Sequence, residues 1–188
     1  PRLWRNLRLG VLGFTLVWLG WYAGAQLSVV HVLTFIEAIR TSFHWDLFLA
    51  EPLTFILWAW IAVAIAFWGR GVYCGWLCPF GALQDLMGRI GRATALPQLR
   101  LPFALHERLL PTKYILFFGL FAISLGDMTL AFLASEVEPF RTAIVLRFMR
   151  WGPLLAYALA ILAGALFIER AFCRYLCPLG AAIALPAR

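Results

Sequence analysis

The chain has 188 residues, of which 63% are hydrophobic and 13% are charged, and this balance excludes an ordinary soluble domain. Its formal net charge of +7 does not indicate nucleic-acid binding, because the arginines lie between apolar segments and form no basic stripe with interleaved aromatic residues. We therefore expect an all-α polytopic membrane protein in a lipid bilayer, with room for four spanning helices of about 20 residues each.

The predicted elements alternate spanning helices with amphipathic ones. In chain order we expect a span at 9–27, an amphipathic helix at 29–43, a span at 52–69, a span at 113–132 that Asp127 interrupts, an amphipathic helix at 135–150 and a span at 152–168. The two amphipathic segments space their apolar residues by three and four, which is typical of helices at the membrane interface. Pro52 suits the first turn of its helix.

The four spans pair up as an internal repeat. One block repeats at an offset of 101 residues and aligns Glu37, Arg40, Thr41 and Pro52 with Glu138, Arg141, Thr142 and Pro153. Another repeats at an offset of 99 residues and contains all four cysteines. We therefore expect one membrane domain over 1–188, with repeat one at about 7–88 and repeat two at about 108–187. Two spans per half give both halves the same orientation, so the repeats are expected to be parallel.

The arginines and lysines predict the topology. The N-terminus, the 69–113 segment and the C-terminal end carry 3, 6 and 3 of them, against 4 in the two opposite segments. The heavier set is expected on the cytoplasmic side of a bacterial inner membrane. This orientation places both cysteine motifs at the cytoplasmic face.

All four cysteines belong to two copies of Cys-x-x-x-Cys-Pro, in VYCGWLCPFGAL (72–83) and FCRYLCPLGAA (172–182). A reduced cytoplasmic compartment argues against a structural disulfide. The spacing and the proline resemble the end of a ferredoxin ligand run, and they differ from the Cys-x-x-Cys of zinc knuckles and thioredoxin-type relays. We therefore expect Cys74, Cys78, Cys173 and Cys177 to hold one [4Fe–4S] cluster between the repeats.

Other interpretations of the cysteines stay open. A membrane scaffold or regulatory redox sensor would use them as a zinc site or a thiol switch, and a thiol relay would move reducing equivalents across the membrane. For the cluster, Pro79 and Pro178 are expected to open helices, and Gly81 and Gly180 to allow close backbone approach. The arginines near the motifs are expected either to offset the charge of the cluster or only to set the topology; they are Arg70, Arg170 and Arg174.

The stretches GVYCGWLCPFGALQDL, QLSVV, SEVEPFRTAI and FCRYLCPLGAA resemble the membrane portion of the NosR/NirI family, which is related to NapH and CcoG type membrane ferredoxins. The resemblance implies a polytopic electron-transfer core that supports the nitrous oxide reductase system in denitrification. It also implies flanks outside this chain, namely a periplasmic flavin domain that carries FMN and a cytoplasmic domain with two ferredoxin-type clusters. The chain is therefore expected to be a piece of a longer protein, although a shorter relative without these domains is the alternative.

A few polar residues outside the motifs carry weaker predictions. Asp127 with His31 or His44 is a candidate quinol or quinone site, against the simpler interpretation that each caps a helix or marks an interface. The spacing of three between Glu37 and Arg40, repeated between Glu138 and Arg141, predicts an ion pair on each helix surface. That repetition also allows a docking surface for the periplasmic flavin domain.

Overall fold

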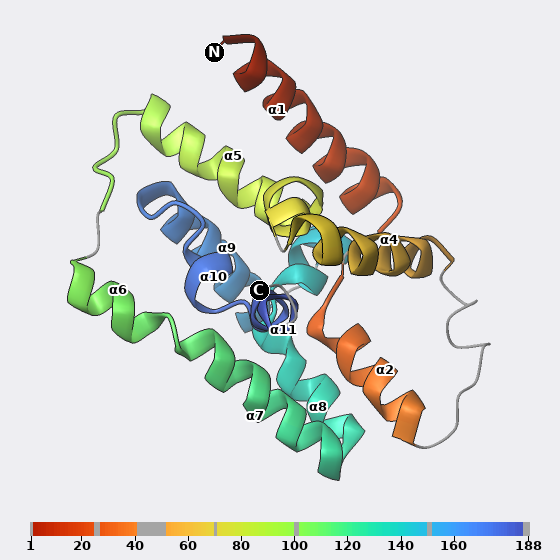
Figure 1. Cartoon of the computed structure of the whole chain (residues 1–188). Coiled ribbons are helices and arrows are strands. Elements are labelled where there is room, and N and C mark those ends of the chain that lie inside the picture. Colours follow the sequence, from red (N-terminus) through yellow and green to blue (C-terminus); the bar gives the residue numbers. More distant parts are fainter. Residues whose placement is uncertain are drawn as a thin grey trace.

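A computed structural model describes residues 2–24, 27–40, 52–69, 71–99, 102–149 and 152–185. Within these ranges the regular secondary structure is helical, without strands, which confirms the all-α prediction. Figure 1 shows the short α11 helix near the middle of the molecule, with the longer helices arranged around it.

The chain begins with α1 (Arg2–Phe14), which passes directly into the π-helical segment η1 (Thr15–Tyr22). This helix starts seven residues before the predicted span. The predicted span follows the apolar run, whereas the helix also includes the charged residues before it. Charged residues spaced three apart share one helix face and leave the other faces apolar. The helix ends before the chain turns through Gly24, which has a positive φ of 63°.

Helices α2 (Val29–Arg40) and α4 (Pro52–Trp68) follow. α2 confirms the helix predicted at 29–43 as far as residue 40, and the remainder of that segment lies outside the described residues. α4 is helical over the residues predicted for the second span, and it begins at Pro52, as expected from the fixed φ of proline and its missing N–H. The first half then ends with η2 (Tyr73–Leu77) and α5 (Pro79–Ala93).

Helices α6 (Phe103–Leu109) and α7 (Thr112–Gly126) are separated only by a short turn. Among the described residues they form one stretch, Phe103–Gly126, that is long and apolar enough to cross a membrane by length and composition. Shorter apolar helices cover Val29–Ala38, Phe55–Ala64 and Pro153–Phe167.

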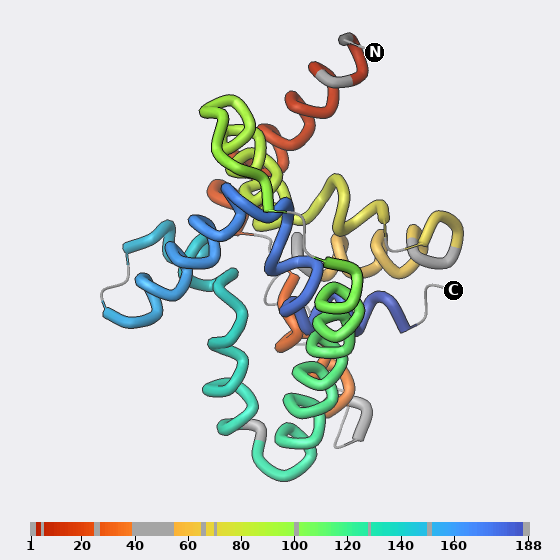
Figure 2. The backbone as a smooth tube through the Cα atoms, turned by 90° about the vertical axis from the view of Figure 1, so that its left-hand side faces the viewer, coloured from red at the N-terminus to blue at the C-terminus, as the bar shows by residue number. Residues whose placement is uncertain are grey.

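The third predicted span does not continue through Asp127 to residue 132. Asp127 has an extended backbone with φ −144° and ψ 113°, and its carboxylate accepts a hydrogen bond from the N–H of Thr129 at 2.8 Å. Aspartate favours this N-cap position over a helix interior because its side chain bonds the free N–H groups of a new helix. That helix, α8 (Met128–Ala134), runs back beside α7, as Figure 2 shows.

The prediction of one amphipathic helix over 135–150 is wrong. The structure has a short 3₁₀ turn, η3 (Ser135–Val137), and a π-helical turn, η4 (Arg141–Val145). Pro139 separates them, because proline lacks an N–H and disfavours a helical conformation in the residue before it. Glu138 is accordingly extended, with φ −82° and ψ 114°. This segment enters the core, where Phe140 and Ile144 are buried.

The second half ends with α9 (Pro153–Phe167), α10 (Ala171–Tyr175) and α11 (Pro178–Ala184). α9 is helical over most of the residues predicted for the fourth span. α5 packs closely along α9, and a Cβ added to Gly91 would lie 2.2 Å from the carbonyl oxygen of Leu166. Elements thus follow in a similar order in the two halves, and the apolar core between them contains Cys78 and Cys177.

Candidate functional site

The two cysteine motifs share one capping geometry, although the turn before the cap is π-helical in the first motif and α-helical in the second. In each, the second cysteine is the N-cap of a helix that begins with proline; Cys78 has φ −77° and ψ 113°, and Cys177 has φ −72° and ψ 108°. The N–H of each donates to the carbonyl oxygen of the residue before the first cysteine, which is Tyr73 or Phe172, at 2.9 Å in both motifs. The predicted role of the prolines as helix openers is therefore confirmed.

Each capping sulfur accepts a backbone hydrogen bond. The N–H of Gly81 donates to Sγ of Cys78 at 3.4 Å, and the N–H of Gly180 donates to Sγ of Cys177 at 3.2 Å. A Cβ on Gly81 would lie 3.2 Å from the carbonyl oxygen of Cys74, so glycine permits this close turn. Free N–H groups at a helix N-terminus favour a negative charge on the sulfur.

All four cysteines are buried or partly buried. Cys78 and Cys177 are each 6% exposed, and Cys74 and Cys173 are partly buried. Burial raises the pKa of the Cys173 thiol well above its ordinary value, and negative charge on Cys78 and Cys74 raises it further, while Arg170 lowers it. Burial also raises the pKa of Cys177, and negative charge on Cys173, Glu138 and Cys78 raises it further. Charge on the first motif therefore raises the pKa of thiols in the second motif.

In the described part of the chain, no three histidine, cysteine, aspartate or glutamate side chains lie close enough to hold a single metal ion. This finding is compatible with the electrostatic coupling of the thiols, because Coulomb interactions in a buried region act over longer distances than a coordination bond.

An ionic cluster not anticipated from the sequence lies beside the first motif. The carboxylate of Asp85, which is 3% exposed, lies 3.5 Å from Nε of Arg170, 3.3 Å from Nε of Arg89 and 3.7 Å from Nη2 of Arg8. Arg170 also donates to the carbonyl oxygen of Cys74 at 3.2 Å. This arginine precedes the second motif in sequence and contacts the first motif in space. Only the spacing of four between Asp85 and Arg89 was a signal that sequence reasoning could have used.

Three buried aromatic rings join the motifs. Phe80 follows the first motif, Phe172 precedes the second, and Phe140 comes from the turn after Pro139. Their ring centroids are 5.1 Å apart for Phe80 and Phe140, 5.6 Å for Phe80 and Phe172, and 5.7 Å for Phe140 and Phe172. All three side chains are at most 2% exposed, so they exclude water from the space between the motifs.

Glu138 is a buried carboxyl group that affects the second motif. Its carboxylate accepts hydrogen bonds from the hydroxyl of Ser28 and from the N–H groups of Val29 and Leu179, at the first turns of α2 and α11. Burial raises its pKa from 4.5 to about 7, and the hydrogen bonds oppose that rise. The predicted pair with Arg141 is wrong, because Arg141 lies 3.7 Å from Glu136 instead. Pro139 is again the cause, since it turns the carboxylate inward.

The other predicted polar residues are dispersed. Asp127 is exposed and serves as a helix cap, whereas Nδ1 of His31 accepts from the N–H of Ser28 and its ring lines a cavity of about 330 Å³ that does not include Asp127. His44 lies outside the described residues. The structure therefore does not assemble the predicted quinol site from Asp127 and His31.

The three arginines near the motifs have different environments. Arg170 lies against the first motif, Arg174 is exposed and lines a separate cavity, and Arg70 lies outside the described residues. The ion pair predicted between Glu37 and Arg40 stays a prediction, because the Arg40 side chain is outside the described part of the structure.

Comparisons with known proteins agree with the motif analysis. A family model described as a 4Fe-4S binding domain matches residues 51–97 and 151–188, which contain both motifs. All 188 residues align at 56% identity with the regulatory protein NosR of Pseudomonas aeruginosa, at 53% with the protein NirI of Paracoccus denitrificans, and at 52% with NosR of Stutzerimonas stutzeri.

The chain belongs to the NosR/NirI family. It covers 26% of each NosR protein and 28% of NirI, so it spans about a quarter of the length of these relatives. No solved structure matches the chain.

Proposed function

We propose that this NosR/NirI-family chain is a membrane electron-transfer core in which Cys74, Cys78, Cys173 and Cys177 hold one [4Fe–4S] cluster. The observation that carries the proposal is the matched geometry of the two motifs, in which a capping sulfur accepts a glycine N–H at the start of each helix. Two such arms supply four thiolates, the usual ligand set of a [4Fe–4S] cluster.

The residues present fit this cofactor. An anionic thiolate-ligated cluster needs positive charge and N–H donors around it, and the helix N-termini and Arg170 offer both. The raised pKa values of Cys173 and Cys177 are those of thiols buried without a metal, and a bound metal stabilises the thiolate form. When bound, the cluster supplies a one-electron carrier.

The protein residues around the cysteines have three roles. Arg170 holds the backbone of the first motif and contributes positive charge, and Asp85 orients Arg170 from the opposite side. The rings of Phe80, Phe140 and Phe172 keep water away from the motifs. Exclusion of water and nearby charge are the main means by which a protein sets the potential of such a centre.

The membrane setting of the proposal combines structure and charge. The stretch Phe103–Gly126 serves as one span, and the helices α1 with η1, α4 and α9 complete four spans in two parallel repeats. The arginines of α5 and α10 then face the cytoplasm of a bacterium, together with the cysteine motifs.

The role that we propose is electron transfer in support of the nitrous oxide reductase system in denitrification, by analogy with the NosR relatives. Its partners would be a periplasmic flavin domain with FMN and a cytoplasmic ferredoxin domain of the parent protein, and a quinone is a further candidate. The word "regulatory" in the relatives' name suits the alternative of a zinc-containing or thiol-based sensor equally well.

The deciding test is the iron, acid-labile sulfide and zinc content of anaerobically purified protein, with an EPR spectrum after dithionite reduction. About four iron and four sulfide per chain with a reduced-cluster signal is the expected result. Zinc without iron would indicate a scaffold or sensor, and disulfides without metal would indicate a thiol relay.

Paired substitutions test whether one cluster is shared. Cys74→Ser with Cys78→Ser, or Cys173→Ser with Cys177→Ser, is expected to remove all the iron, because each pair supplies half of the ligands. Retention of half the iron by either variant would refute the shared cluster. Helical circular dichroism and the elution volume on size exclusion confirm that each variant still folds.

A further inference from the structure

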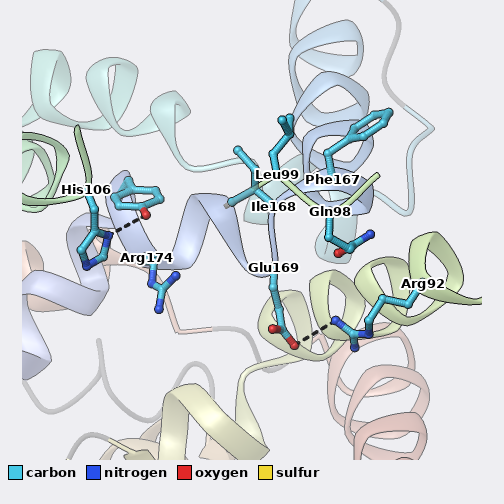
Figure 3. Close-up of a pocket in the computed structure, with 9 residues that line it drawn as sticks. Arg92, Gln98, Leu99, His106, Phe167, Ile168, Glu169 and Arg174 are labelled. Carbon is cyan, nitrogen blue, oxygen red and sulfur yellow. Dashed lines mark hydrogen bonds and ion pairs between the residues drawn. The ribbon is translucent and has the colours of Figure 1, made fainter. Parts of the chain in front are cut away.

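A cavity of about 470 Å³ lies beside the second cysteine motif, between the ends of α5, α6, α9 and α10. Figure 3 shows its polar side chains, with His106 hydrogen-bonded to Tyr175 on one side and Arg92 paired with Glu169 on the other. Apolar side chains line the remainder, including Leu99 and Phe167. The cavity is therefore amphipathic, with a polar and an apolar wall.

The walls of this cavity are held by specific contacts. Leu99 donates its N–H to the carbonyl oxygen of Phe167 at 3.0 Å, and the Gln98 amide donates to the carbonyl oxygen of Leu166 at 2.9 Å. Nδ1 of His106 lies 2.8 Å from the Tyr175 hydroxyl, which joins α6 to the second motif. The loop after α5 is thus fastened to α9, and the cavity is a formed feature of the fold.

The charge of the lining residues is positive. Arg92 and Arg174 contribute two guanidinium groups against the single carboxylate of Glu169. Arg174 has no ion-pair partner among the described residues. The pair between Arg92 and Glu169, at 3.2 Å, is 42% and 57% exposed, so it is weak and Arg92 is available to a stronger anion. Arginine binds phosphate oxygens with two parallel N–H donors.

The position of the cavity indicates the source of that anion. His106 belongs to the first turn of the stretch Phe103–Gly126, so the cavity lies at one end of the candidate span, where lipid headgroups are found. Basic pockets between helices at the cytoplasmic side of a membrane bind anionic lipid headgroups. An apolar wall beside the arginines suits the glycerol and acyl chain of a lipid better than it suits free phosphate.

We propose that this cavity binds the phosphodiester headgroup of an anionic phospholipid through Arg92 and Arg174. This inference depends on the membrane setting proposed above and does not depend on the cluster. Because Arg174 and Tyr175 lie between Cys173 and Cys177 in the chain, a bound headgroup also adds negative charge beside the second motif, where it lowers the potential of the proposed cluster.

The test uses the full-length parent protein in detergent, titrated with short-chain phosphatidylglycerol and, separately, short-chain phosphatidylcholine, with bound lipid counted by native mass spectrometry. The variant Arg92→Gln with Arg174→Gln is expected to bind phosphatidylglycerol at least tenfold more weakly and phosphatidylcholine as before. Arg174→Lys keeps the charge and is expected to keep most of the selectivity. The matched control is Arg108→Gln, since Arg108 is exposed on α6 outside the cavity; it should change the affinity less than twofold.

Several results would overturn the proposal. Unchanged phosphatidylglycerol binding in the double variant, or an equal loss in the Arg108→Gln control, would show that the cavity is not the lipid site. Displacement of the lipid by inorganic phosphate at equal concentration would assign the cavity to free phosphate. If the double variant bound lipid normally and only reacted more slowly with a soluble redox protein, the cavity would be a protein-docking site.

Iron measured on the same samples separates this proposal from that of the cluster. Lipid selectivity without iron refutes only the cluster, and a full cluster without lipid selectivity refutes only the lipid site.

Discussion

Replacing Asp85 by asparagine tests the charge cluster that connects the two halves beside the first motif. Asp85→Asn keeps the shape of the side chain and one oxygen acceptor but removes the negative charge between Arg8, Arg89 and Arg170. Three guanidinium groups then face one another without a counter-ion. We expect the folded chain to lose stability and Arg170 to release the carbonyl oxygen of Cys74.

The magnitude follows from distance and exposure. At about 3.5 Å and an effective dielectric constant of about 20, one pair of unit charges attracts by about 5 kcal/mol before desolvation is subtracted. Removing one partner of a fully buried pair costs about 3–5 kcal/mol, because a buried charge is left uncompensated. Here the side chains of Arg170, Arg89 and Arg8 are 22%, 24% and 36% exposed and reach water in part. We therefore expect a loss of about 2–3 kcal/mol in the free energy of unfolding.

The assay is reversible unfolding in mixed detergent and SDS micelles, followed by tryptophan fluorescence, on wild type, Asp85→Asn and a control. Asp127→Asn is the matched control, because Asp127 is exposed, its carboxylate accepts only the N–H of Thr129 in the described structure, and asparagine caps helices about as well as aspartate. If Asp85→Asn lay within about 0.5 kcal/mol of wild type, the range of neutral surface substitutions, the charge cluster would not stabilise the fold.

Two further substitutions test packing and pH dependence. Gly91→Ala is expected to lose about 1–3 kcal/mol in the free energy of unfolding, because its Cβ would lie 2.2 Å from the carbonyl oxygen of Leu166. The control Gly119→Ala, with no atom within 4 Å of its Cβ, should be neutral or stabilising. Equal effects of the two substitutions would refute the close contact. The pKa of Glu138 is about 7 in the folded chain, above its ordinary 4.5, so the stability that it contributes is complete below pH 4.5 and is lost as pH rises through 7. The free energy of unfolding of the wild type should therefore be lower at pH 8 than at pH 5, and Glu138→Gln should not show this decrease. An equal decrease in both proteins would contradict the raised pKa.

Features with local causes were predicted well from the sequence. Pro79 and Pro178 open helices as expected, and Gly81 closely approaches the preceding turn, because each effect depends on residues that are neighbours in the chain. At Gly180 a Cβ would have only ordinary contacts, so the close approach expected there is absent. The errors also have local causes. Apolar spacing predicted one helix through Pro139, since a periodicity takes no account of a missing N–H. Asp127 was expected to interrupt the third span, and it ends α7 and caps α8.

Contacts between distant segments left no such signal. Asp85 and Arg170 are far apart in the chain, and neither their spacing nor their composition indicates that they meet. The spacing of three between Glu138 and Arg141 predicted a helix-surface residue, yet Glu138 is buried and bonds Ser28. Burial of a charge is decided by the packing of whole helices, which a single sequence without relatives does not display.

The local structure of each motif is therefore distinct from the placement of one motif against the other. The matched caps at Cys78 and Cys177 form within short segments, but the links that align them cross between the halves, from Arg170 to the backbone of Cys74 and from Phe140 to Phe80. Either half alone has two thiols and lacks the groups that bring the other two near. It follows that a four-thiolate site requires both halves in one fold, and that changes in the cross-links should disturb the site while each motif keeps its local shape.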